Sequence, residues 1–173
     1  MDTLPYVTLV LGGGRSGKSR HAEGLVMAHP APWIYIATAE AYDDEMRARI
    51  ATHQARRSDD WQTVDAPVAL PEMLGKAGGR PVLVDCLSMW LSNLMLGDRD
   101  LAGAFEAFDK ALAARAAPTV LVSNEVGLSI VPDNALGRAF RDEMGFLNQR
   151  VASRAAKVIF MVAGLPMVVK DET

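Results

Sequence analysis

A glycine-rich segment near the N-terminus carries the clearest chemical pattern in this sequence. It fits G-x-x-x-x-G-K-[ST], and it lies between an apolar strand-like run and a helix-like run. Glycines let backbone N–H groups curve around phosphate oxygens, Lys18 offers a positive charge to the β- and γ-phosphates, and the Ser19 hydroxyl can bind Mg²⁺. The pattern predicts a nucleoside triphosphate site at Gly12, Gly13, Gly14, Arg15, Ser16, Gly17, Lys18 and Ser19.

A second candidate is the carboxylate that closes the apolar run Val-Leu-Val-Asp at residues 82–85. In proteins with a phosphate-binding loop, an aspartate in such a place helps to hold Mg²⁺. Asp85 can also cap the helix that we expect from Leu87 onward. The two interpretations are compatible, so the sequence leaves both open. Neither one separates a kinase from a nucleotide hydrolase or a nucleotidyltransferase.

The third candidate is His53, one of three histidines in the chain. It shares a helix face with Met46 and Ile50, which favours a partly buried histidine whose neighbouring arginines suit a helix C-terminus. The alternative is a nucleophilic imidazole beside a phosphate-binding pair, Arg56 and Arg57. Residue spacing alone does not decide between these interpretations.

The segments that must position these residues alternate between strand and helix patterns. Apolar, β-branched runs predict strands at residues 6–11, 33–37, 81–85, 119–123, 157–162 and 167–170. Helical patterns occupy residues 19–28, 43–55, 87–96, 102–115 and 134–155. Strands separated by helices predict an α/β fold with a mostly parallel sheet covered by helices. Ligands of such sheets bind at the carboxyl ends of the strands, where the loop and Asp85 fall.

Length and composition limit the remaining possibilities. The 173 residues fit a single domain spanning residues 1–173, with 50% hydrophobic and 23% charged residues. A net charge of −3 argues against a nucleic-acid coat or a polybasic membrane anchor. The lone Cys86 excludes an internal disulfide framework and a multi-cysteine metal site. No apolar run approaches the about 18 residues of a transmembrane helix and no signal peptide is apparent, so we expect a cytoplasmic protein.

Several further motifs occur together with the phosphate loop and give the chain a specific resemblance. They are Ala37-Thr38, the Asp-Asp-Glu-Met segment at 43–46 leading to His53, Asp85-Cys86-Leu87, Asn-Glu-Val-Gly at 124–127, Ile-Val-Pro at 130–132, Phe-Arg-Asp at 140–142 and Asn148-Gln149. From about residue 7 to residue 170, the chain resembles the bifunctional adenosylcobinamide kinase / adenosylcobinamide-phosphate guanylyltransferase family.

The resemblance implies a P-loop NTPase-type fold of the recombinase-like kind and a homotrimer. It also implies two reactions that use GTP, ATP and Mg²⁺ in cobalamin biosynthesis. The first phosphorylates adenosylcobinamide, and the second transfers GMP from GTP to adenosylcobinamide phosphate through a guanylylated histidine. A kinase without guanylyl transfer is the enzymatic alternative, and a nucleotide-binding regulatory protein is the alternative from another class.

Residue by residue, the resemblance assigns the guanylylated histidine to His53. The family often has two adjacent histidines here, whereas this chain has Thr52-His53. Beyond the phosphate loop, GTP contacts carry over to Ala37, Thr38, Ala39, Gln54, Ala55, Arg56, Arg57, Asp65 and Asp85. At both Asp65 and Asp85 the family also uses glutamate. Ser19 and Asp85 are the expected Mg²⁺ ligands.

Some residues leave their roles open. Glu125, in the Asn-Glu-Val-Gly segment, can contact substrate or Mg²⁺, or the segment can be a turn whose Asn and Gly suit the backbone. We expect Trp61, Trp90 and the nine methionines in the core rather than on the corrinoid. Cys86, after a buried strand, is expected to be inert packing.

Overall fold

A computed structural model of the chain describes residues 3–40, 44 and 57–173. The strands in these ranges form one seven-stranded sheet with the order β3-β2-β4-β5-β1-β6-β7. All neighbouring strands run parallel except β6 and β7, which form an antiparallel hairpin. The bounds are β1 Leu4–Gly12, β2 Trp33–Ala37, β3 Trp61–Asp65, β4 Val82–Asp85, β5 Thr119–Asn124, β6 Ala155–Val162 and β7 Leu165–Asp171. The predicted α/β fold with a mostly parallel sheet is confirmed.

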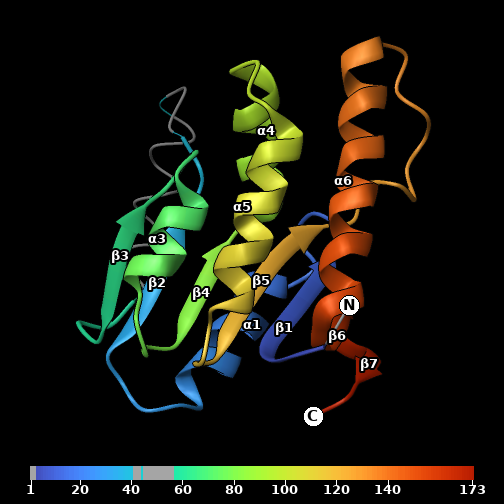
Figure 1. Cartoon of the computed structure of the whole chain (residues 1–173). Coiled ribbons are helices and arrows are strands. Elements are labelled where there is room, and N and C mark those ends of the chain that lie inside the picture. The colour runs from blue at the N-terminus through green and yellow to red at the C-terminus, as the bar shows by residue number, and fades with distance from the viewer. Residues whose placement is uncertain (1–2, 41–43, 45–56) are drawn as a thin grey trace.

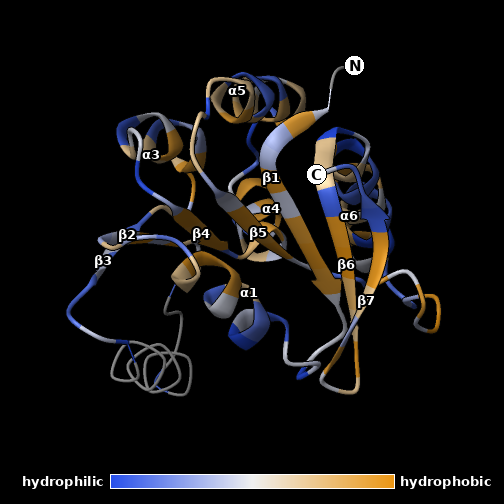
Figure 2. Ribbon diagram, turned by 90° about the horizontal axis from the view of Figure 1, so that it is seen from below, coloured by the Kyte–Doolittle hydropathy of each residue, from blue (hydrophilic) through white to orange (hydrophobic). Residues whose placement is uncertain are grey.

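Helices cover both faces of this sheet. The described helices are α1 Lys18–Met27, α3 Leu70–Lys76, α4 Leu87–Leu96, α5 Leu101–Ala113 and α6 Ala135–Arg154. Figures 1 and 2 show α1 on one face, with α3 and α5 on the other. Among the described residues, no helix is long and apolar enough to cross a membrane.

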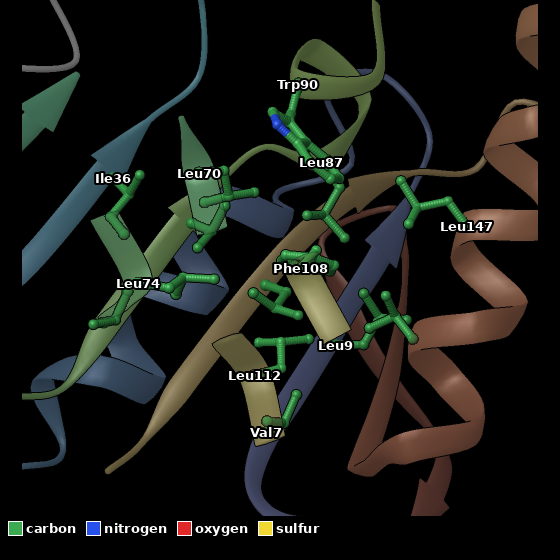
Figure 3. Packing of buried hydrophobic residues seen from close by; sticks show 14 of the residues in the cluster. Val7, Leu9, Ile36, Leu70, Leu74, Leu87, Trp90, Phe108, Leu112 and Leu147 are labelled. Atoms are coloured by element: carbon green, nitrogen blue, oxygen red, sulfur yellow. The ribbon is translucent and has the colours of Figure 1, made fainter. Parts of the chain in front are cut away.

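Two hydrophobic clusters follow from this layering. The larger one joins the face of the sheet around Leu9 to the helices α3–α6, and its aromatic centre is Trp90, whose ring lies 5.1 Å from that of Phe108 (Figure 3). The smaller cluster joins α1 to the other face and includes Trp61 and Met161. Figure 2 shows the hydrophobic residues concentrated in the central strands. The alternating strand side chains thus bury one row on each face.

The expectation of core positions is confirmed for some of these residues and wrong for others; Met1 and Met46 lie outside the described residues. Trp61 and Trp90 are buried, and so is Cys86. Met27 and Met167, however, are 47% and 52% exposed, so the expectation of a buried position is wrong for both. Met27 ends α1, and Met167 lies on β7, the edge strand of the sheet. Among the described residues, no further layer covers either side chain.

Most predicted elements are present, and two unpredicted ones appear. The strand β3 pairs with β2 at the sheet edge, and its mostly exposed side chains lack the apolar run that marks the buried strands. The helix α3 has only seven residues and contains Pro71 and Gly75, so its periodicity is weak. The helix predicted at residues 43–55 lies outside the described residues except for Asp44, which is helical.

Candidate active site

The phosphate loop connects β1 directly to α1. Strand β1 ends at Gly12, and α1 begins at Lys18 after Gly17, whose φ of 89° places it in the left-handed region. A Cβ atom on Gly12 would collide with the Ser16 hydroxyl and crowd the Met161 backbone, so this position requires glycine. The loop therefore brings the N-terminus of α1 to the carboxyl end of the sheet, where its N–H groups can bind an anion.

Lys18 is held in a defined position within this loop. Its side chain is buried, and its Nζ donates a hydrogen bond to the Gly13 carbonyl at 2.8 Å. Burial lowers the pKa of Lys18, while the nearby Cys86 and Asp85 raise it. The ammonium group is thus oriented over the loop and lies within the electrostatic field of Asp85. A phosphate bound there meets a preorganised positive charge.

Asp85 ends β4, half-buried, at the same edge of the sheet. Its Oδ2 accepts a 2.9 Å hydrogen bond from the Tyr35 hydroxyl. The N-cap of α4 is Cys86, so the interpretation of Asp85 as that helix cap is wrong. In the described ranges, no cluster of three His, Cys, Asp or Glu side chains can hold a metal ion. One carboxylate and the Ser19 hydroxyl are hard oxygen donors of the kind that Mg²⁺ takes together with substrate phosphates.

Tyr35 is a site residue that the sequence analysis missed. Burial and the Asp85 charge raise its pKa, so its hydroxyl stays protonated and donates to the carboxylate. Its ring also carries the Arg57 guanidinium, whose Cζ lies 3.4 Å from the ring centroid. Arg57 Nη1 donates to Thr63 Oγ1 at 2.8 Å. The sequence could have pointed to this residue, because a tyrosine inside a buried strand needs a hydrogen-bond partner for its hydroxyl.

The ends of three neighbouring strands bring further predicted residues into one row. In the strand register, Ala37 of β2 lies opposite both Asp65 of β3 and Asp85 of β4. The next residue, Thr38, is fully buried; its hydroxyl donates to the Cys86 carbonyl at 2.6 Å and accepts from the Cys86 N–H at 2.8 Å. The Thr38 side chain therefore fastens β2 to the start of α4, and Ala39 follows it at the sheet edge.

The Asn-Glu-Val-Gly segment begins at the end of β5, the strand between β1 and β4, and lies beside the loop's first glycine. The Glu125 N–H donates to the Gly12 carbonyl at 3.1 Å, and the Glu125 Oε1 accepts from the Gly127 N–H at 2.6 Å. Asn124 is fixed by a 2.7 Å hydrogen bond to Ser88. These contacts support the turn interpretation of this segment and show that its backbone braces the phosphate loop.

The structure thus gathers the phosphate loop and the row of Ala37, Asp65 and Asp85 at the carboxyl ends of the strands. Arg57 precedes β3 and reaches this group through its contact with the Tyr35 ring. Four further predicted site residues, His53, Gln54, Ala55 and Arg56, lie outside the described residues, and so does the neighbouring Thr52. They belong to the connection between β2 and β3, which leaves β2 at this edge of the sheet and enters β3 at the opposite edge, because the two strands are parallel.

Comparison with known families identifies the family to which the chain belongs. The family model of cobinamide kinase / cobinamide phosphate guanyltransferase matches residues 8–169. The chain belongs to this family. The prediction of a kinase and guanylyltransferase of cobalamin biosynthesis is therefore confirmed, and a purely regulatory nucleotide-binding protein is set aside.

The names of similar proteins agree with this family assignment. The bifunctional adenosylcobalamin biosynthesis protein CobP of Pseudomonas aeruginosa is 48% identical over 95% of this chain and 97% of its own length. The corresponding protein CobU of Escherichia coli K12 is 39% identical over 94% of this chain and 98% of its own length. CobU of Salmonella typhimurium is 38% identical over 94% of this chain and 98% of its own length.

Solved structures resemble this chain in fold alone. A Pyrococcus horikoshii OT3 protein superposes with a TM-score of 0.55 at 9% identity, covering 99% of this chain and 89% of that one. An ATPase of a bacterial type III secretion system gives a TM-score of 0.53 at 14% identity, covering 94% of this chain and 56% of that one. Both likenesses support the α/β fold.

Proposed function

We propose that residues 12–19 bind the nucleoside triphosphate for both reactions of this enzyme. In the first, ATP or GTP gives its γ-phosphoryl group to a hydroxyl of adenosylcobinamide. In the second, GTP gives GMP to adenosylcobinamide phosphate. The observation that carries the proposal is the position of Lys18, buried against Gly13 and within the field of Asp85. Phosphoryl transfer depends mainly on such positioning and charge.

Ser19 and Asp85 are the proposed Mg²⁺ ligands. The ion would neutralise charge on the β- and γ-phosphates when bound. Tyr35 supports this role because its hydroxyl orients the Asp85 carboxylate through Oδ2. Protein ligands held by a second layer of hydrogen bonds bind a metal in one geometry.

His53 is the proposed nucleophile for guanylyl transfer, as the family resemblance implies. A ring nitrogen attacks the α-phosphorus of GTP, the bond from that phosphorus to the β-phosphate oxygen breaks, and pyrophosphate leaves. The phosphate of adenosylcobinamide phosphate then attacks the same phosphorus and releases the histidine. Covalent catalysis of this kind divides one difficult transfer into two easier ones.

The proposed guanosine contacts are the remaining residues at this edge. They are Ala37, Thr38, Ala39, Gln54, Ala55, Arg56, Arg57 and Asp65. Because the Thr38 hydroxyl is engaged with Cys86, a contact from this segment would use backbone groups. The exposed Asp65 carboxylate can accept hydrogen bonds from ribose hydroxyls or base N–H groups. On the resemblance alone, we propose a cytoplasmic, single-domain homotrimer.

Replacing the nucleophile tests this proposal. His53→Ala should give no GMP adduct when incubated with GTP and Mg²⁺, because alanine cannot attack phosphorus, while much of the kinase activity survives. Intact-protein mass spectrometry detects the adduct, and adenosylcobinamide phosphate formation reports the kinase. His29→Ala is the control, since His29 is an exposed histidine outside the site.

An adduct in the His53 variant would place the nucleophile elsewhere. No adduct in the wild-type protein, together with intact kinase activity, would leave the enzyme a kinase without guanylyl transfer. Loss of both activities in a folded His53 variant would make His53 part of shared nucleotide binding.

A further inference from the structure

A cavity of about 460 Å³ lies beside the phosphate loop, on the side away from Asp85. One wall is the first two turns of α1, and the other is the end of β6 with the turn of the β6–β7 hairpin. The lining includes Gly17, Arg20, His21, Gly24, Leu25 and Met161. None of these residues other than Gly17 belongs to the site proposed above.

The hairpin wall is fastened to the phosphate loop. The Gly164 N–H donates a 3.1 Å hydrogen bond to the Ser16 carbonyl. A Cβ atom on Gly17 would lie 3.5 Å from the Gly164 Cα, so loop and turn are in close contact. The cavity therefore keeps a fixed position relative to any phosphate held by the loop.

The sheet order indicates which end of a triphosphate faces this cavity. Strand β1 has β5 and then β4 on one side, and β6 and then β7 on the other (Figure 2). Lys18 and Asp85 draw the γ-phosphate and its metal toward the β4 side. The α-phosphate then lies over the first turn of α1, and the nucleoside continues toward the β6–β7 side.

We propose that, in the kinase reaction, the nucleoside of the triphosphate donor binds in this cavity. This inference rests on the proposed use of the phosphate loop and deepens it. Leu25 and Met161 offer apolar contact, and the Arg20 guanidinium can stack on the face of a base. The His21 Nε2 is buried without a partner among the described residues, which leaves a hydrogen-bonding group for the nucleoside. The lining thus combines apolar side chains with a few polar groups that can orient a nucleoside.

This position separates the two reactions of the enzyme. In the sequence, His53 belongs to the connection that leaves β2, and β2 lies on the β4 side of the loop. Attack on the α-phosphorus from there requires GTP to place its α-phosphate and nucleoside on that side. We therefore expect two poses of the triphosphate. The cavity serves the pose for γ-phosphoryl transfer, and the row of Ala37, Asp65 and Asp85 serves the pose for guanylyl transfer.

Filling the cavity tests the inference. Gly24→Phe adds a large side chain to the lining of the cavity, and the Cβ at this exposed helical position meets no atom within 4 Å. We expect the KM for the triphosphate donor of the kinase reaction to rise at least about fivefold, as overpacking a site commonly costs. The rate of GMP-adduct formation on the protein should change less than about twofold by the same reasoning.

Gly75→Phe in α3 is the matched control. Gly75 is also an exposed helical glycine with open space at its Cβ, and it lies on the other face of the sheet. Thermal melting of both variants checks that they fold. An unchanged donor KM in the Gly24 variant, or equal loss of both reactions, would overturn the inference.

Photolabelling gives a second, direct measurement. With 8-azido-ATP, the label should appear in peptides containing residues 20–25 or 161–164, and excess ATP should prevent it. Label confined to residues 33–65 would also overturn the inference. Failure of the proposed function has a different signature: Lys18→Ala would retain both reactions, or His53→Ala would retain its adduct, whatever the cavity variants do.

Discussion

The two sides of the phosphate loop differ in chemistry although both are built from strands of one sheet. On the β4 side, Tyr35 and Asp85 form a hydrogen-bonded pair, and Arg57 lies on the Tyr35 ring. On the β6–β7 side, a cavity is lined by Leu25 and Met161 together with the polar side chains of Arg20 and His21. The first side suits charged phosphates and a metal ion, and the second suits the flat, less polar body of a nucleoside.

This difference indicates that the orientation of a triphosphate along the loop is set by the structural elements on either side of it. The backbone N–H groups of a phosphate loop bind an anion without defining where the rest of the ligand goes. Here a carboxylate stands two strands away on one side, and a hairpin turn touches the loop on the other. The triphosphate donor is oriented because these sides are unlike.

The largest loss of activity is expected from removing the positive charge of Lys18, which serves both reactions. Lys18→Ala should lower both reactions by about 10²- to 10³-fold, comparable to losing one preorganised donor in other active sites. Initial rates of phosphorylation and of GMP-adduct formation measure this loss. Lys76→Ala, which removes an exposed lysine paired with Glu72, is the control. Wild-type rates in the Lys18 variant would reveal a second nucleotide site.

The next effect concerns the β4 side alone. Asp85→Asn should raise the Mg²⁺ concentration needed for half-maximal kinase activity about tenfold, because an amide is a weaker ligand than a carboxylate. The amide oxygen can still accept the Tyr35 hydrogen bond, so the melting temperature should change little. Magnesium titration and melting on one preparation separate the two effects. Exposed Asp59→Asn is the control, and an unchanged Mg²⁺ response would make Asp85 structural.

The smallest effect concerns the β6–β7 side. Gly164 has φ of 81°, and its N–H holds the hairpin to Ser16. Gly164→Ala should therefore lower the free energy of unfolding by about 1 kcal/mol through left-handed backbone strain. A loosened cavity wall should also raise the donor KM, with guanylyl transfer less affected. Gly79→Ala, at an open position outside the left-handed region, is the control; equal behaviour of the two variants would contradict this account.

Local patterns in the chain were sufficient for much of this description. The strand at 33–37 and the helix at 87–96 have the predicted bounds, because a dense apolar run and a helical period are properties of short segments. Strand β3 and helix α3 were not predicted, since an exposed edge strand and a seven-residue helix with Pro71 carry weak patterns. Tyr35 was missed because its partner Asp85 is fifty residues away in the chain.

The sequence by itself determined the phosphate loop, the strand-ending Asp85 and the family, because each rests on residue types at fixed spacing. Only the tertiary structure decided that β5 separates β1 from β4 and that the β6–β7 turn touches the loop at Gly164. Strand order and turn contacts depend on packing between segments distant in the chain, which no local pattern encodes. For the same reason, the cavity beside α1 is a property of the fold: Leu25 and Met161 become neighbours only after the sheet has formed.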